Sequence, residues 1–227
     1  VLLTSVVTMP SYQWVHLETK VKIANAPNGT FETRMNGIPI LSGSGLDTQN
    51  GLDASFDTVS LSGGWGGTGS YECRYDHFYL LNNTPPNNDF LGAVQILTHF
   101  PAKNGSLVEW SPGAYEPNHL NIDTTINPDR FNYSASGSAT DLYDFDDVPI
   151  SGSILGLQIN TVAKQGAGGT KNLSNTMLFS GSLVSGSAIP LTASNNIITS
   201  IYNTDPAGNQ WTADNVNATE FGYKTVT

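Results

Sequence analysis

A strict alternation of apolar and polar side chains marks the first predicted strand, at residues 14–23. One side of the pattern is mainly apolar: Val15, Leu17, Thr19, Val21 and Ile23. The other side is polar: His16, Glu18, Lys20 and Lys22. A period of two is typical of a β-strand with one face in the core. We therefore expect the Leu17 side to be buried and His16 to lie on the outer face.

Turn residues divide the next part of the chain into further short strands. Pro27-Asn28-Gly29 predicts a turn, because Pro presets φ and Gly takes a positive φ that other residues resist. Asn36-Gly37 is the strongest hairpin signal, and it joins strands predicted at 31–35 and 38–41. After a loop at 42–55, the pattern predicts a strand at 56–62, a Gly-rich tip at 63–70 and an aromatic strand at 71–81.

Two prolines among small polar residues mark the clearest break in the chain: Asn82-Asn83-Thr84-Pro85-Pro86-Asn87-Asn88-Asp89. Such a stretch is stiff, extended and poorly able to pair with a strand. We therefore predict a linker at residues 82–92, between a first module at 1–81 and a second module at 93–227.

The second module is predicted to be rich in β-strands as well. Alternation and turn signals place its strands at 93–100, 155–163, 175–179, 197–202 and 221–226. Residues 101–140 are irregular, and such a segment is long for a loop in a compact domain. One short helix is expected at 211–216, with Thr212 as its N-cap.

These patterns predict an all-β fold of two antiparallel β-sandwich or jelly-roll modules. The chain opens on Val1-Leu2-Leu3-Thr4-Ser5-Val6-Val7, without an initiator Met. The run also lacks the basic start and the small-residue cleavage site of a signal peptide. It has the pattern of a strand entered within a domain, so we expect the first module to be incomplete at its N-terminus.

Composition and charge narrow the function classes. The 227 residues carry 9 Lys and Arg against 19 Asp and Glu, a formal net charge of −10, and 12% of residues are charged. An average soluble domain has roughly 25% charged residues. An acidic chain has no basic surface for nucleic acid or anionic lipid, and no apolar run approaches the roughly 20 residues that span a bilayer. The single Cys rules out an internal disulfide framework.

Motifs for catalysis are weak or missing. The run Gly64-Trp65-Gly66-Gly67-Thr68-Gly69 satisfies G-x-G-x-x-G, but a strand pattern follows it where a dinucleotide site needs a helix. The sequence has no G-x-S-x-G motif, and its glutamates do not form the paired carboxylates of a glycosidase. Cys73 has the setting of a buried structural thiol. We therefore predict a protein that is not an enzyme, with no catalytic residues and no cofactor.

Metal sites are not expected either. The four histidines, at positions 16, 77, 99 and 119, have no metal-ligand spacing. The densest acidic patch is Asp141, Asp144, Asp146 and Asp147. It lacks the spacing, the Gly and the terminal Glu of an EF-hand calcium loop, so we interpret it as a solvated turn before Val148-Pro149.

Trp65, on the Gly-rich tip, is the single candidate for ligand contact. An exposed indole ring can stack on a sugar face, and its N–H can donate a hydrogen bond. The alternative is that Trp65 packs back over the edge of the sandwich. The other tryptophans are expected to anchor cores: Trp14, Trp110 and Trp211.

Several stretches of the first module resemble the second half of LamG or concanavalin-like domains in bacteriophage structural proteins. The resemblance rests on Trp14-Val15-His16-Leu17-Glu18, Arg34-Met35-Asn36-Gly37 and Tyr75-Asp76-His77-Phe78-Tyr79. In the second module, Leu142-Tyr143-Asp144-Phe145-Asp146-Asp147 and Thr204-Asp205-Pro206-Ala207-Gly208-Asn209 look like the module that follows such domains in tailed-phage proteins.

The resemblance implies a non-enzymatic structural protein on the surface of the virion, as a tail or fibre component or a capsid decoration. Its expected partners are other virion proteins and copies of itself in a homo-oligomer. The alternative is a lectin-like module that binds carbohydrate on the host surface, with or without calcium. A lectin-like fold does not establish sugar binding, so both hypotheses stay open at this point.

Overall fold

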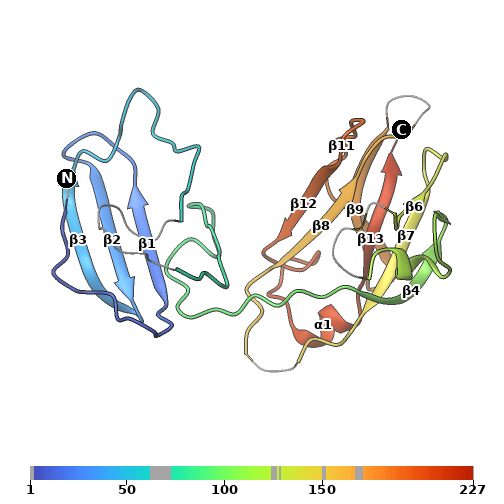
Figure 1. The fold of residues 1–227 in the computed structure, drawn as a ribbon, viewed down its shortest axis with the longest axis horizontal. Coiled ribbons are helices and arrows are strands. Elements are labelled where there is room, and N and C mark those ends of the chain that lie inside the picture. Colours follow the sequence, from blue (N-terminus) through green and yellow to red (C-terminus); the bar gives the residue numbers. More distant parts are fainter. Residues whose placement is uncertain are drawn as a thin grey trace. The chain divides into compact units, whose positions relative to one another are not determined.

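Among the residues that the structure describes, 37% lie in strands and 4% in helices. The computed structural model describes residues 3–61, 73–123, 127, 129–149, 152–166 and 171–226. They fall into two units, Val1–Leu97 (unit 1) and Thr98–Thr227 (unit 2), each with its own sheets (Figure 1). The predicted all-β class with antiparallel sheets is confirmed.

Unit 1 is built on a three-stranded antiparallel sheet in the order β1-β2-β3 (Figure 1). The strands are β1 (Leu17–Lys22), β2 (Gly29–Met35) and β3 (Ile38–Leu46). Asn36 and Gly37 join β2 to β3 with φ values of 52° and 79°, as the two-residue hairpin requires. The predicted hairpin is therefore confirmed.

The covered face of β1 is the opposite of the one that the alternation predicts. Glu18 is only 6% exposed, whereas Leu17 is 49% and Val21 40% exposed. The reason is a set of hydrogen bonds to Glu18 Oε1, which accepts from the Tyr79 hydroxyl at 2.5 Å and from the Leu91 and Gly92 N–H groups at 2.8 and 3.0 Å. His16 lies on this same covered side and is not an outer-face residue; its Nδ1 is 3.8 Å from Glu18 Oε2.

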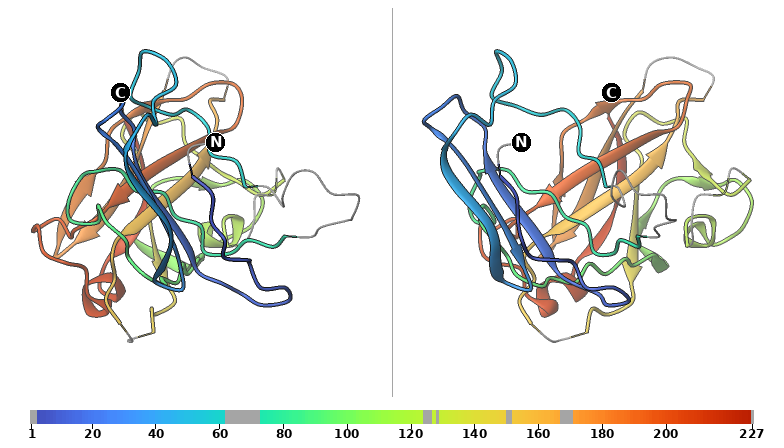
Figure 2. Two further views of the ribbon diagram at one scale, coloured as in Figure 1. Left: turned by 90° about the vertical axis from the view of Figure 1, so that its left-hand side faces the viewer. Right: turned by 60° about the vertical axis from the view of Figure 1, so that its left-hand side comes forward.

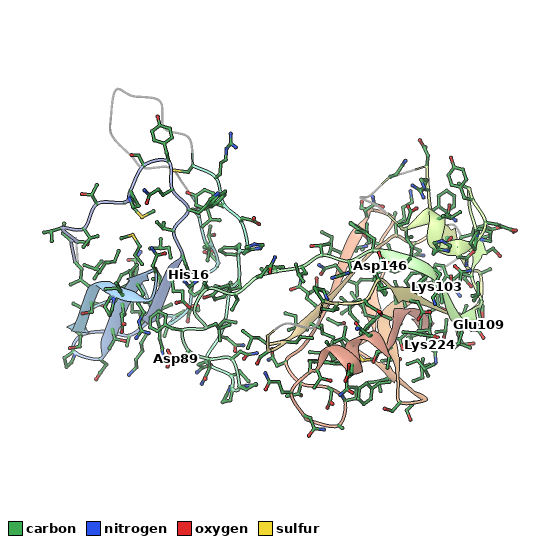
Figure 3. All side chains as sticks on the ribbon, turned by 90° about the horizontal axis from the view of Figure 1, so that it is seen from below. His16, Asp89, Lys103, Glu109, Asp146 and Lys224 are labelled. Carbon is green, nitrogen blue, oxygen red and sulfur yellow. The ribbon has the colours of Figure 1, made fainter. Side chains whose placement is uncertain are left out.

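Residues 82–92, expected as a linker, lie within unit 1, whose division from unit 2 falls after Leu97. Besides the bonds to Glu18, Asp89 accepts a hydrogen bond from Lys20 Nζ at 3.0 Å. The guanidinium of Arg34 lies 3.9 Å from the centre of the Phe90 ring, a cation–π contact. Figure 3 labels His16 and Asp89 on this unit. These contacts attach the segment to the polar face of the sheet.

Three predicted strands do not form in the described residues. Residues 56–61, 73–81 and 93–100 contain no β-strand. Their apolar and aromatic side chains have strand propensity, but propensity forms a strand only where a neighbouring strand offers a ladder. Cys73 is exposed, so the prediction of a buried thiol is wrong.

Unit 2 contains a main antiparallel sheet in the order β10-β9-β13-β7-β4, with β11 also paired to β9. Its strands are β4 (Pro101–Val108), β7 (Thr140–Phe145), β9 (Asn172–Phe179), β10 (Ser182–Ser185), β11 (Ile189–Pro190) and β13 (Glu220–Val226). β9 and β13 agree with the predicted strands at 175–179 and 221–226. β4 and β7 were not predicted.

A two-stranded antiparallel sheet of β8 (Leu157–Ala163) and β12 (Asn196–Tyr202) lies against the main sheet and completes a sandwich (Figures 1 and 2). Asn175 of β9 joins the two layers. Its Nδ2 donates to the backbone carbonyls of Ile159 and Ile198, both at 3.0 Å, and its Oδ1 accepts from Thr161 at 2.6 Å. Two apolar clusters fill the space between the layers, centred on Tyr143 and Leu173 and on Met177 and Trp211.

The short helix α1 (Ala213–Asn217) forms where the sequence predicts it. The side chain of Thr212 accepts a hydrogen bond from the Asn215 N–H at 3.1 Å, so its predicted N-cap role is confirmed. Trp211, directly before the helix, is buried in the core as expected.

We expect Glu18→Ala to destabilise unit 1 by about 3 kcal/mol, because three hydrogen bonds to a buried carboxylate are lost. Hydrogen exchange should show faster exchange of the Leu91 and Gly92 amides. Asp57→Asn, at an exposed site in the same unit, should change neither quantity. Unchanged protection of both amides in Glu18→Ala would contradict the assigned role.

The same carboxylate makes unit 1 sensitive to acid. Burial raises the pKa of Glu18, but the hydrogen bonds from Tyr79, Gly92 and Leu91 outweigh it and hold the pKa below its ordinary value of 4.5. A lowered pKa in the folded state stabilises the fold above pH 4.5, and this stabilisation is lost as the pH falls through the lowered value. Unfolding measured between neutral and acid pH should show this slope, and Glu18→Gln should reduce it.

Candidate functional site

A buried carboxylate organises the irregular part of unit 2. Asp141, the second residue of β7, is 0% exposed. Its Oδ1 accepts hydrogen bonds from the Glu109 and Trp110 N–H groups, both at 2.8 Å. Its Oδ2 accepts from Asn118 Nδ2 at 2.7 Å and from the Tyr143 hydroxyl at 2.8 Å. Four charge-assisted bonds make this burial tolerable.

The prediction of a solvated turn at the acidic patch is therefore wrong for Asp141 and Asp144, which belong to strand β7. Asp144 is half-buried and pairs with Lys103 at 3.0 Å, while Asp146 and Asp147 are exposed after the strand. Figure 3 labels Lys103 and Asp146 on unit 2. Among the described residues, no group of three or more His, Cys, Asp or Glu side chains could hold a metal ion.

Two tyrosine hydroxyls and an asparagine extend the network from Asp141. The hydroxyls of Tyr143 and Tyr223 are 2.7 Å apart, and Asn132 Nδ2 donates to them at 3.0 and 3.2 Å. Burial raises the pKa of Tyr143, and the neighbouring Tyr223 and Asp141 raise it further. Burial and Asp141 also raise the pKa of Tyr223. Both phenols therefore stay protonated at neutral pH and serve as hydrogen-bond donors.

This network anchors the described residues 109–123 and 129–133, which we call the anchored loop. It contains β5 (Ser111–Pro112), the 3₁₀ helix η1 (Asn118–Asn121) and β6 (Asn132–Tyr133). Asn118 Nδ2 donates to the Trp110 carbonyl at 2.8 Å, and Asn132 Nδ2 also lies 3.1 Å from the Asn118 carbonyl. Asn121 accepts from the Tyr115 N–H at 3.0 Å and donates to the Tyr115 carbonyl at 2.8 Å.

The outer side of the anchored loop carries two exposed aromatic rings. β5 and β6 pair Ser111 with Tyr133 and Pro112 with Asn132, and the Gly113 N–H donates to the Phe131 carbonyl at 2.7 Å. Since side chains alternate along a strand, Asn132 points into the network while its two neighbours point outward. Phe131 is 50% and Tyr133 54% exposed, with ring centres 6.4 Å apart. We call these two rings the aromatic pair.

Gly113 is required beneath the aromatic pair. A Cβ atom at this position would lie 2.6 Å from the Phe131 ring and from its carbonyl oxygen, closer than real contacts allow. On the same loop, exposed Tyr115 lies 5.4 Å from the guanidinium of Arg130, which pairs with Asp123 at 2.6 Å. On a backbone that is fixed in place, aromatic rings can stack on a polar ligand and neighbouring polar groups can hydrogen-bond to it.

The structure places the predicted site residues as follows. Trp65 lies outside the described residues. Trp14 is largely exposed in unit 1, so its predicted role as a core anchor is wrong. Trp110 packs edge-on against Tyr223 at 4.8 Å between ring centres and donates from Nε1 to the Ala139 carbonyl at 3.2 Å, and therefore anchors the loop.

Four residues of this network were not predicted from the sequence: Asp141, Tyr143, Asn132 and Tyr223. A signal was present, because Asp141, Tyr143 and Phe145 alternate with Thr140, Leu142 and Asp144 as in a strand. The several aspartates favoured a turn instead, since Asp is depleted in strands and common in turns. Nothing in the spacing indicates that Asn132 and Tyr223, 91 positions apart, share one hydrogen bond.

Comparisons of the chain with protein-family models, with curated proteins and with solved structures find no match. In the part of the chain that the structure describes, no helix has the length and apolar character to cross a membrane.

We expect Asp141→Asn to destabilise unit 2 by about 2–4 kcal/mol, because an amide cannot accept all four hydrogen bonds and has no charge to strengthen them. The melting temperature should fall, and the amides of the anchored loop should exchange faster. Asp146→Asn, the same change at an exposed site five residues away, should leave both unchanged. Equal effects of the two variants would contradict the role of Asp141.

Proposed function

We propose that this chain is a non-enzymatic structural protein on the surface of a bacteriophage particle, as a tail or fibre component or a capsid decoration. The observation that carries the structural role is the exposed apolar row on one face of the sheet in unit 1. Leu17, Met35 and Ile38 are cross-strand neighbours and form one apolar row over all three strands. The phage setting comes from the resemblance of the sequence motifs.

The two faces of this sheet differ in a way that favours assembly. The Glu18 face is covered by residues 77–92 of the same chain, through the contacts of Tyr79, Asp89 and Leu91. On the other face, Leu17, Val21 and Ile38 remain exposed. An antiparallel sheet that faces water is usually polar on that side, and a contiguous exposed apolar face is typical of a protein contact. We assign this face to a neighbouring capsid or tail subunit.

The first test is the presence of the protein in purified phage particles, by mass spectrometry and antibody labelling. We expect Ile38→Lys to reduce incorporation at least tenfold, a factor that corresponds to about 1.4 kcal/mol of lost contact energy. Val59→Lys, also exposed and in unit 1, should be incorporated normally. Absence of the wild-type protein from particles would overturn the proposal.

A second candidate function is carbohydrate binding on the host surface, and the aromatic pair favours it. Phe131 and Tyr133 present exposed rings from a backbone that the Asp141 network holds in place. Such a surface suits the apolar face of a sugar ring, and the hydroxyl of Tyr133 can bond the sugar edge. The net charge of −10 favours a neutral or cationic glycan over an anionic one.

A glycan array with the intact protein, with and without chelator, tests this function and any part that calcium plays in it. If the aromatic pair binds sugar, Phe131→Ala and Tyr133→Ala should each weaken binding about tenfold through lost stacking. Tyr12→Ala, which removes a fully exposed ring in unit 1, should bind as the wild type does. No binding by the intact protein would exclude this second function.

A further inference from the structure

The outer face of the two-stranded β8–β12 sheet in unit 2 is exposed and carries an apolar side chain at each end. Val162 pairs across the strands with Ile197, Asn160 with Thr199, and Gln158 with Ile201. Ile197 is 68% and Ile201 65% exposed, and Val162 is exposed as well. We call these six side chains the β8–β12 face. They alternate along the strands with the inward residues that contact the main sheet.

In the polar centre of the β8–β12 face, one side-chain oxygen is a shared acceptor of hydrogen bonds from within the chain. Asn160 Oδ1 accepts from Thr199 Oγ1 at 2.9 Å and from Gln158 Nε2 at 3.0 Å. These bonds link the three polar side chains to one another. A partner surface can therefore cover them without leaving the shared acceptor unpaired.

The β8–β12 face belongs to a stretch of the chain that contains no acidic side chain. All 19 Asp and Glu residues of the chain lie outside residues 148–204, and this stretch contains two charged side chains, Lys164 and Lys171. Neither β8 nor β12 carries a charge. Two chains that each bear a net charge of −10 repel one another over about a Debye length. They meet at lowest electrostatic cost through a surface that excludes their acidic groups.

We propose that the β8–β12 face is a self-association surface that binds the same face of a second copy of this chain. The charge pattern selects a second copy as the occupant, because a basic partner gains nothing from a face without acidic groups, whereas a like-charged copy requires one. The inference deepens the proposed structural role, and its meaning for a particle rests on that role.

A two-fold contact matches the positions of the apolar side chains. Ile197 and Ile201 point the same way from β12 and lie four residues apart, roughly 13 Å along the strand. When two identical faces stack with their β12 strands antiparallel, Ile197 of one copy lies over Ile201 of the other, and the polar centres meet midway. This is an isologous interface, in which one patch serves both subunits.

Sedimentation equilibrium of the purified full chain tests the inference in solution, without any phage component. We expect a reversible dimer whose fraction grows with protein concentration. Raising the salt concentration should strengthen it, since screening weakens the repulsion between acidic chains. Ile197→Lys should raise the dimer dissociation constant at least about tenfold, because it buries two like charges at the contact. Leu52→Lys, a fully exposed site in unit 1, should not.

A cross-linking experiment distinguishes this face from any other contact. The substitution Cys73→Ser removes the native thiol. In that background, Thr199→Cys places one thiol at the centre of the β8–β12 face. A short bis-maleimide should join two copies through this thiol, and Leu52→Cys should not cross-link. Circular dichroism and melting temperature must match the wild type for each variant.

A monomer at all concentrations up to about 100 μM, or equal weakening by Ile197→Lys and Leu52→Lys, would overturn the self-association surface. Neither result bears on whether the protein is found in phage particles, which tests the proposed function separately. Conversely, a dimer that Ile197→Lys dissociates supports this surface even if the protein is absent from particles.

Discussion

The structure of unit 2 depends on one buried carboxylate. Asp141 lies on β7 between β4 and β13, where a charge is costly unless every oxygen is bonded. The backbone of residues 109–110, Asn118 and Tyr143 supply the four donors. Because these groups must converge on one point, the anchored loop has one favourable path over the sheet. Glu18 does the same in unit 1, where it attaches residues 79 and 91–92 to β1.

Some acidic side chains are therefore buried, while some apolar side chains are exposed. Two of the acidic side chains, Asp141 and Glu18, lie inside and attach irregular segments to sheets. Apolar side chains such as Leu17 and Ile197 are exposed on the faces of their sheets. The buried carboxylates fix irregular segments on the sheets. The exposed apolar side chains leave surfaces that a partner can cover. Under the proposed structural role, each unit keeps its own shape while its exposed apolar surface contacts other subunits.

Local signals predicted local structure well. The Asn36-Gly37 turn needs only the two residues that accept positive φ, and the Thr212 cap needs one hydroxyl three residues before the Asn215 N–H. The strands β8 and β12 were predicted at 155–163 and 197–202, but their pairing with each other was not. Strands expected at 56–62 and 71–81 are absent from their described parts, because a strand also needs a partner. The strand β7 was missed because aspartates usually mark turns.

The sequence by itself determined the all-β class, the hairpin turns and the short capped helix, since these depend on contacts within a few residues. The tertiary structure alone decided which face of β1 is covered. A period of two shows that the two faces of β1 differ, but whether Glu18 or Leu17 is buried depends on Tyr79 and on the backbone of residues 91–92. Likewise, Asp141 is a core residue only because donors more than 20 positions away in the chain reach it. Such pairings are long-range, and no local pattern records them.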